Sequence, residues 1–307
     1  MRINVALDVL FLRASFWHGG EDTDTKKMAP LVNQYFYHGF FDQYGMTELK
    51  GLRALPIGET IEDSREILPY EEVAKVLDSK EYFAVSICPC KHRKNIDPDS
   101  PNCSYPTEVC LHFDRLGRYT VENGMGREIT RQEAEEILRQ SAEVGLVHGI
   151  SNYQEGVDTI CNCDPCCCIW FEAFHKLKHT KSMDASNYRV RTNPETCIGD
   201  GLCVKRCHME ALRLEDFPET KGRVTVVAAE NRSGKKELKN KTGKVAVLNP
   251  DLCIGCGVCA YKCPTKSLVL ERREVIRHPP ETGREYVIRT AADFAAARSR
   301  GEQQEED

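Results

Sequence analysis

Residues 253–264 read Cys253-Ile-Gly-Cys256-Gly-Val-Cys259-Ala-Tyr-Lys-Cys263-Pro264. This C-x2-C-x2-C-x3-C-P spacing is typical of thiolates that bind an iron–sulfur cubane. The first three thiolates each bind one iron of the same cluster, and the fourth binds an iron of a different cluster. The run therefore predicts a second run elsewhere in the chain, with which it exchanges one ligand.

The second run lies upstream and reads Cys197-Ile-Gly-Asp200-Gly-Leu-Cys203-Val-Lys-Arg-Cys207-His208. Its spacing matches that of the downstream run, which indicates two copies of one cluster-binding unit. Asp200 stands where the second cysteine would be, and His208 stands where the proline would follow. We expect His208 to begin a helix rather than to bind iron.

The exchange of ligands between the runs assigns four donors to each of two sites. Cluster B is expected to take three cysteines from the downstream run and one from the upstream run, namely Cys253, Cys256, Cys259 and Cys207. Cluster A is expected to take the other three cysteines, with the aspartate at the remaining corner, namely Cys197, Cys203, Cys263 and Asp200.

Three alternatives stay open for Asp200. Its carboxylate could bind the fourth iron of a [4Fe–4S] cluster, or it could leave that corner open in a [3Fe–4S] cluster. It could also be a solvated loop residue beside a site that has decayed. Because a carboxylate is a harder ligand than a thiolate, the fourth iron of cluster A is expected to be labile.

The N-terminal part of the chain contains nine further cysteines. Four of them are expected to form a third cluster: Cys88, Cys90, Cys103 and Cys110. The other five are candidate ligands of a fourth cluster: Cys161, Cys163, Cys166, Cys167 and Cys168. Adjacent cysteines cannot all face one metal ion, so one or two of the last three are expected to be only buried. Whether the two sets form separate clusters or exchange ligands stays open.

Zinc is the alternative metal for the first of these N-terminal sets. Four thiolates can also form a tetrahedral zinc site. Zinc ribbons carry two C-x2-C pairs, and neither N-terminal set contains two such pairs. The presence of the two ferredoxin-like runs in the same chain therefore favours iron–sulfur clusters.

The basic segment 91–94 directly follows Cys90 and has two interpretations. It could raise the potential of a nearby cluster or bind an acidic partner, since positive charge acts on both. It could equally be a solvated, positively charged turn.

Composition restricts the class of protein. The chain has 307 residues, 16 cysteines and a formal net charge of −5. The tight grouping of the cysteines favours metal over disulfides, since disulfide geometry is demanding. The negative charge argues against nucleic acid as a partner. With no signal peptide and no apolar run of about 20 residues, we expect a cytoplasmic protein without a membrane span. Neither a GxGxxG fingerprint nor a P-loop is present, so no nucleotide or flavin site is expected.

Local patterns predict a mixture of helices and short strands. A capping box at Thr130 and Glu133 predicts a helix through Val144 that ends at Gly145. Residues 223–228 and Lys244–Leu248 are expected to pair as a β-hairpin with a long basic loop between them. The further predicted helices are 26–41, 69–78 and 168–178, and the further strands are 82–87, 146–150, 188–191 and 214–215.

Residues 186–275, with the two runs described above, resemble a dicluster bacterial-type ferredoxin domain. The segment 70–168 resembles a group of 4Fe–4S ferredoxin-like electron-transfer proteins of anaerobic bacteria and archaea. Asp164 departs from the pattern of that group, because a cysteine is expected at its position. The resemblance to both groups implies electron transfer in the service of larger redox systems. The motifs shared with the second group are Cys88-Pro-Cys90, 103–111, 126–130, 145–148, and Cys161-Asn-Cys163 with Cys167-Cys168.

Together these observations predict an α+β protein with three parts. Residues 1–185 are expected to form an N-terminal mixed α/β cysteine-rich iron–sulfur domain, and 186–275 a ferredoxin-like domain with a β-hairpin insertion. Residues 276–307 are expected to be an extension with an acidic, disordered tail from Gly301.

The expected function is electron transfer through three or four clusters. The chain would be a subunit or adaptor between a reduced flavoprotein or ferredoxin and a catalytic oxidoreductase subunit, and not an enzyme by itself. One alternative is a redox enzyme with a substrate or cofactor at an N-terminal cluster. A second alternative is a zinc-stabilised interaction protein with a ferredoxin tail.

Overall fold

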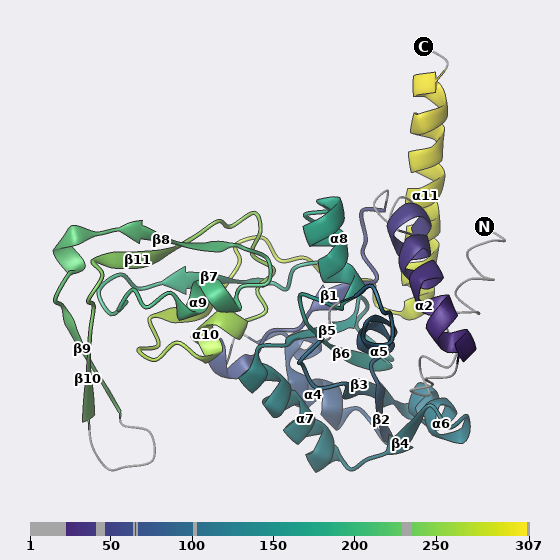
Figure 1. Cartoon of the computed structure of the whole chain (residues 1–307), viewed down its shortest axis with the longest axis horizontal. Helices are drawn as coiled ribbons and strands as arrows, with labels where there is room; N and C mark the ends of the chain where they lie inside the picture. Colours follow the sequence, from purple (N-terminus) through teal and green to yellow (C-terminus); the bar gives the residue numbers. More distant parts are fainter. Residues whose placement is uncertain are drawn as a thin grey trace.

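The computed structural model describes residues 23–40, 47–63, 65, 67–100, 103–228 and 235–305. Predictions for residues 1–22, and for the end of the helix expected at 26–41, lie outside these residues. The described residues form helices and small antiparallel sheets, which confirms the predicted α+β class. Figure 1 shows the cysteine-rich part on the right and the ferredoxin-like part on the left.

A six-stranded antiparallel sheet forms the centre of the N-terminal part. Its strand order is β1-β5-β6-β3-β2-β4. Strand β2 ends one residue before Cys88, as the sequence predicts, and β3 and β6 carry further cysteines. The strands are β1 (Leu52–Ala54), β2 (Phe83–Ile87), β3 (Glu108–Phe113), β4 (Gly126–Glu128), β5 (Val147–Ser151) and β6 (Thr159–Cys163).

Helices pack around this sheet and position the cysteine segments. Helix α7 (Arg131–Val144) follows the predicted capping box, in which Thr130 Oγ1 accepts a hydrogen bond of 3.1 Å from the amide of Glu133. It ends at Gly145, whose φ of 95° is left-handed. The other helices are α2 (Thr23–Tyr35), α4 (Val73–Asp78), α5 (Pro89–Asn95), α6 (Asp114–Glu122) and α8 (Ile169–Leu177).

Two predicted helices are shorter than expected. The helix predicted at 69–78 is divided into a 3-10 turn (Pro69–Glu71) and α4, because Glu72 is extended between them. The helix predicted at 26–41 ends at Tyr35 and continues as one π-helical turn (Phe36–Phe40).

The ferredoxin-like part consists of two similar halves (Figure 1). In each half a cysteine run leads into a short helix and then into a strand of a two-stranded antiparallel sheet. Strand β7 pairs with β12, and β8 pairs with β11. The elements are β7 (Tyr188–Thr192), α9 (Leu202–Arg206), β8 (Leu212–Asp216), β11 (Lys244–Leu248), α10 (Val258–Tyr261) and β12 (Leu268–Arg272).

The insertion between the halves is a β-hairpin, but not with the predicted partner. Strand β9 (Val224–Ala228) pairs with β10 (Lys235–Lys239), whereas Lys244–Leu248 pairs with β8. The predicted pairing of 223–228 with Lys244–Leu248 is therefore wrong. Strand β10 reads Lys-Lys-Glu-Leu-Lys and is almost entirely exposed, so it has no apolar alternation that would mark it as a strand.

The C-terminal extension ends in the long helix α11 (Gly283–Glu305), which projects away from the body in Figure 1. The middle of this helix contacts the N-terminal part, since the Asp293 carboxylate accepts a hydrogen bond of 3.1 Å from the Glu48 amide. The acidic segment from Gly301, for which the sequence predicts disorder, continues this helix to Glu305. The alanine-rich stretch before it has high helix propensity and explains the difference.

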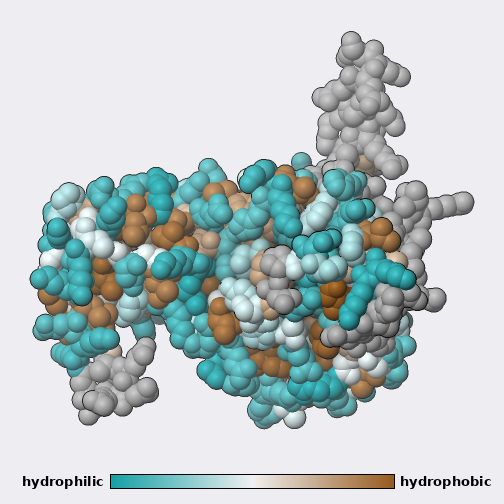
Figure 2. All heavy atoms as spheres, viewed as in Figure 1, coloured by the Kyte–Doolittle hydropathy of each residue, from teal (hydrophilic) through white to brown (hydrophobic). Residues whose placement is uncertain are grey.

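Polar residues cover much of the visible surface in Figure 2, and apolar ones form small separate patches. Among the residues that the structure describes, no helix combines the length and apolar character that crossing a membrane requires.

Candidate metal sites

The four cysteines predicted for cluster B line one small cavity, here called cavity B. Cys207 enters it from the end of α9, and the other three come from the loop before α10 and from α10 itself. The Ala211 amide donates a hydrogen bond of 3.2 Å to Cys207 Sγ. The four lining thiols are Cys207, Cys253, Cys256 and Cys259.

Cavity B suits a group that carries positive charge. Burial raises the pKa of Cys256 to about 12, and burial with the neighbouring thiols raises that of Cys259 well above its ordinary value. Converging thiolates in so apolar a cavity need cations between them, which iron ions supply. Gly255 allows the loop to lie against β7, because a Cβ there would come within 2.2 Å of the Tyr188 carbonyl oxygen.

A second small cavity, here called cavity A, is lined by the residues predicted for cluster A: Cys197, Cys203, Cys263 and Asp200. Asp200 is the exposed member, and its Oδ1 accepts a hydrogen bond of 3.1 Å from the Leu202 amide. Burial, followed by the charges of Cys197, Asp200 and Cys263, raises the pKa of Cys203 to about 12. Three soft donors and one hard donor therefore face the same space.

The base of the hairpin insertion supports the loop of cavity A, which sequence reasoning missed. Asn240 Nδ2 donates hydrogen bonds to the carbonyl oxygens of Cys197 at 3.1 Å and Lys244 at 3.0 Å. Thr242 Oγ1 donates to the Gly199 carbonyl at 3.1 Å. The insertion thereby fixes the backbone that carries the first ligand of the upstream run.

The sheet gathers six N-terminal thiols, each buried or half-buried, into one set, here called the six-thiol group. Neighbouring thiols in it shift one another's pKa, as Cys88 and Cys90 do, and as Cys110, Cys161 and Cys163 do. The pKa of Cys161 lies well below its ordinary value because two of these thiols donate to it. The members are Cys88, Cys90, Cys110, Cys161, Cys163 and Cys168.

The remaining three N-terminal thiols lie together with one carboxylate, a set here called the Cys103 group. Its ligand atoms all lie within 4.8 Å of one another. Cys103 Sγ is 3.4 Å from Cys166 Sγ, which is 3.8 Å from Cys167 Sγ. The members are Cys103, Asp164, Cys166 and Cys167.

The structure therefore groups the nine thiols differently from their order in the sequence. Cys103 does not join the other three cysteines of the expected third cluster, and Cys110 lies with Cys161. Pairing of β3 with β6, in which Leu111 faces Ile160, explains the second contact. The loop after α5 carries Cys103 to the turn at 164–167 and explains the first.

In the sequence, Asp164 stands out only because a cysteine is expected at its position. In the structure this residue is fully buried. Its Oδ1 accepts hydrogen bonds from the amides of Cys166 at 3.0 Å and Cys167 at 2.7 Å. These bonds form the turn that presents both cysteines. An aspartate two and three residues before cysteines is itself a turn signal, and it could have marked this residue.

The basic segment on α5 is buried, so its interpretation as a solvated turn is wrong. The Lys91 side chain is fully buried and donates from Nζ to the carbonyl oxygens of Pro106 at 2.9 Å and Asn162 at 3.2 Å. Lys91 Nζ also lies 3.7 Å from Asp164 Oδ2. Its charge helps to lower the pKa of Cys88 and Cys161, after the larger effect of neighbouring thiols. The ammonium group of Lys91 therefore lies close to negative charge in both the six-thiol group and the Cys103 group.

Arg93 is also fully buried and lies beside the Cys103 group. Its Nη2 donates to the Cys167 carbonyl at 3.2 Å and to Glu172 Oε2 at 2.5 Å. Burial opposes ionisation of Glu172, but Arg93 first, then Lys176 and other donors outweigh it and hold the pKa of Glu172 at about 2. The side chain of Arg93 is thereby fixed as a cation.

His208 does not begin a helix, because it lies in the turn between α9 and β8. Its Nε2 donates to the Gly145 carbonyl at 2.6 Å, and its ring meets that of Phe171 edge-on at 5.5 Å. Arg206 donates to the Ala142 carbonyl at 2.7 Å. The residues on both sides of Cys207 thus bind the C-terminal end of α7.

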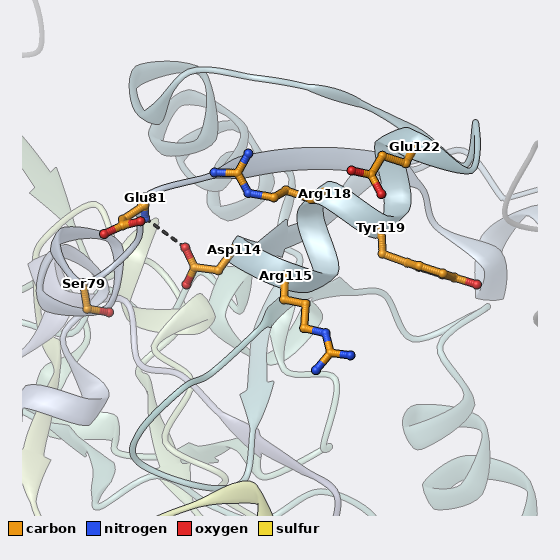
Figure 3. Close-up of a pocket in the computed structure, with 7 residues that line it drawn as sticks. All are labelled: Ser79, Glu81, Asp114, Arg115, Arg118, Tyr119 and Glu122. Carbon is orange, nitrogen blue, oxygen red and sulfur yellow. Dashed lines mark hydrogen bonds between the residues drawn. The ribbon is translucent and has the colours of Figure 1, made fainter.

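A different hollow lies on the surface beside α6 (Figure 3). In it the Glu81 amide donates to Asp114 Oδ1 at 2.9 Å. The described residues that line it carry charges of both signs and include no cysteine, so it offers no iron–sulfur site. They are Ser79, Glu81, Asp114, Arg115, Arg118, Tyr119 and Glu122.

Comparison with known proteins finds similarity in the region that contains cavities A and B. Residues 196–267 match the model of the 4Fe-4S dicluster domain. A segment of 79 residues is 30% identical to Ferredoxin-3 of Rhodobacter capsulatus and covers 26% of this chain and 76% of that protein. A putative ferredoxin-3 of Sinorhizobium fredii is 32% identical over 77 residues, or 25% of this chain and 71% of the relative.

A third relative is much longer than this chain. It is a pyruvate-flavodoxin oxidoreductase of Rhodospirillum rubrum, 32% identical over 90 residues. The match covers 28% of this chain and only 7% of that protein.

Proposed function

Because this chain belongs to the 4Fe–4S dicluster ferredoxins through residues 196–267, we propose that it conducts electrons between redox proteins along three iron–sulfur clusters. Two would be clusters A and B, in cavities A and B. The third would be bound by four of the thiols of the six-thiol group. Each such cluster supplies a site for one electron at a time.

The observation that carries this proposal is the continuous apolar packing between the three sites. One cluster of buried residues contains Cys163 and Cys168 of the six-thiol group together with cysteines of both cavities. Val147 lines cavity B and pairs directly with Cys163 across strands β5 and β6. The third site and cavity B are therefore only as far apart as two neighbouring strands of the sheet.

Cavities A and B are also neighbours. The charge of Cys203 in cavity A contributes to the raised pKa of Cys259 in cavity B, after burial and the nearer thiols. Exposed Asp200 lies at the outer side of cavity A. This order supports a path from the six-thiol group through cavity B to cavity A, with one end close to solvent.

The partners that fit such a path are a reduced flavoprotein or ferredoxin as donor and a catalytic oxidoreductase subunit as acceptor. The name of the R. rubrum relative, a pyruvate-flavodoxin oxidoreductase, supports a place for such a segment in a redox enzyme. Sixteen cysteines without disulfides suit a reducing compartment, which supports the cytoplasm.

The test uses the full chain, purified without oxygen and mixed rapidly with a reduced small ferredoxin or flavodoxin. We expect stepwise bleaching of the visible cluster absorption, followed by reduction of added cytochrome c. We also expect magnetic coupling between the N-terminal cluster and cluster B in EPR spectra, and its loss in Cys207→Ser.

Two outcomes would contradict the proposal. One is an N-terminal EPR signal that the Cys207→Ser variant leaves unchanged, since the sites would then be isolated from each other. The other is bleaching by NADH alone at the rate seen with the protein donors, since the chain would then contain a nucleotide site of its own.

A further inference from the structure

The Cys103 group has the geometry of a site for a single ion. We propose that Cys103, Cys166, Cys167 and Asp164 bind one divalent metal ion of the zinc class, and not an iron–sulfur cubane. This site is separate from the clusters of the proposed electron path and does not depend on them.

The spacing of the donor atoms favours one ion. Tetrahedral zinc binds thiolate sulfur at about 2.3 Å, which places neighbouring sulfurs about 3.8 Å apart. The two sulfur pairs in the Cys103 group are separated by 3.4 Å and 3.8 Å, and all four donors lie within 4.8 Å of one another. A cubane instead needs each thiolate at a different iron corner, which requires wider separation.

The carboxylate is fixed in the position of a fourth ligand. Asp164 Oδ1 lies 2.9 Å from Cys166 Sγ and is held there by the amides of Cys166 and Cys167. Asp164 Oδ2 is buried and has no hydrogen-bond donor among the residues that the structure describes, although Lys91 Nζ lies 3.7 Å away. A buried carboxylate oxygen without a donor is costly unless a cation compensates it.

The charges around the group match a divalent ion. Three thiolates and one carboxylate carry four negative charges, and a divalent ion leaves a net charge of minus two. Lys91 faces Asp164, and Arg93 donates to the Cys167 carbonyl at 3.2 Å. Lys91 offsets part of the remainder, and Arg93, which is also paired with Glu172 at 2.5 Å, adds positive charge beside the group. Zinc accepts both thiolate sulfur and carboxylate oxygen as ligands, and its preferred geometry is tetrahedral.

The position of the group separates it from the other thiols. Cys166 is exposed, whereas each thiol of the six-thiol group is buried or half-buried, and Cys103 is half-buried as well. An ion could therefore enter from solvent without disturbing the neighbouring cluster. It would link two segments that lie 63 residues apart and would close the loop after α5 onto the start of α8.

Metal analysis of the full chain, purified anaerobically from zinc-supplemented medium, tests this inference. We expect about one zinc per chain, with X-ray absorption showing three sulfur neighbours and one oxygen. Cys103→Ser and Asp164→Asn should lower zinc binding at least tenfold and leave the iron content unchanged. Cys207→Ser is the matched control, in which iron should fall and zinc should stay.

Three results would overturn the inference. The first is wild-type protein without zinc in which Cys103→Ser removes about four iron atoms, as expected for a cubane. The second is a zinc spectrum with four sulfur neighbours. The third is zinc that survives both substitutions. The X-ray absorption spectrum of zinc in the wild-type protein tests the site even if a variant fails to fold. The electron-transfer assay tests the proposed function independently of this site.

Discussion

The ferredoxin-like region and the cysteine-rich sheet both gather thiols, but over very different lengths of chain. In cavities A and B, each site takes most of its donors from one run of about a dozen residues, wound around the site by a glycine-containing loop. In the six-thiol group, Cys88 follows β2 and Cys168 follows β6, two strands that are far apart in the sequence and separated only by β3 in the sheet. The first kind of site is encoded by spacing, and the second by strand register.

The two regions also differ in what surrounds the sulfur atoms. In cavity B a backbone amide, that of Ala211, donates to Cys207 Sγ. Beside the N-terminal groups the compensating charges are side chains, Lys91 and Arg93, both completely buried. Substitutions should therefore affect the two regions in different ways.

The exchange of ligands between the two runs can be broken by one substitution. Cys207→Ser should remove cluster B and about four iron atoms per chain, although Cys207 belongs to the upstream run. Cys263→Ser should remove cluster A instead. Iron content and EPR spectra of both variants check this. Loss of the same EPR signal in both variants would refute the crossed pairing.

The buried lysine tests the charge compensation in the N-terminal region. Lys91→Met should destabilise the protein by about 3 kcal/mol, because Asp164 would lose the buried ammonium 3.7 Å away and two buried carbonyl oxygens would lose their donor. Exposed Lys75 on α4 offers the matched control, and Lys75→Met should change stability by less than about 1 kcal/mol. Thermal unfolding of the anaerobic holoprotein compares them. Equal thermal unfolding midpoints in the two variants would show that Lys91 does not compensate the charge of Asp164.

The sheet also contains a histidine that makes stability depend on pH. Burial lowers the pKa of His148 from 6.5 to about 4, although its Nδ1 donates to Asn162 Oδ1 at 2.6 Å. The unfolded state binds the His148 proton more tightly than the folded state. The contribution of neutral His148 to the free energy of unfolding is therefore complete above about pH 6.5 and is lost as the pH falls toward 4. Between pH 7 and pH 5 the loss should be about 2 kcal/mol.

Unfolding of His148→Gln across this pH range isolates the contribution. The variant should lose less stability on acidification than the wild type. His278→Gln, at an exposed histidine, should keep the wild-type dependence. A variant at His148 with the full wild-type slope would assign the effect to another group.

The smallest expected effect concerns one corner of cluster A. Mild oxidation of the wild type should release a single iron and give a [3Fe–4S] EPR signal, because Asp200 is a hard and exposed donor. Asp200→Cys should abolish this signal and lower the potential of cluster A, with cluster B unchanged. Identical spectra of variant and wild type would place Asp200 outside the cluster.

Sequence alone predicted the donors that line cavities A and B because their spacing follows from a local wrap of the backbone. It also predicted α7, since the capping box and Gly145 are local signals. It missed β10, which has a single apolar residue, Leu238, and it missed the contact between Cys103 and Cys166. Both depend on tertiary pairing, which leaves no periodic pattern in the sequence.

The burial of Lys91 and Arg93 could not be read from the sequence either. A cluster of basic residues normally indicates a solvated surface. Here the surrounding carboxylates, Asp164 and Glu172, come from segments more than 70 residues away. Only the folded sheet brings these opposite charges together.

Cys207 lies between two residues whose side chains bind carbonyl oxygens at the end of α7. Arg206 binds Ala142 and Glu143, and His208 binds Gly145. The segment 196–267 excised from this chain would keep every candidate donor of both cavities. It would lose the three carbonyl oxygens that orient the neighbours of Cys207. Proteolytic separation of the two regions should therefore damage cluster B before cluster A, even though no ligand is cut away.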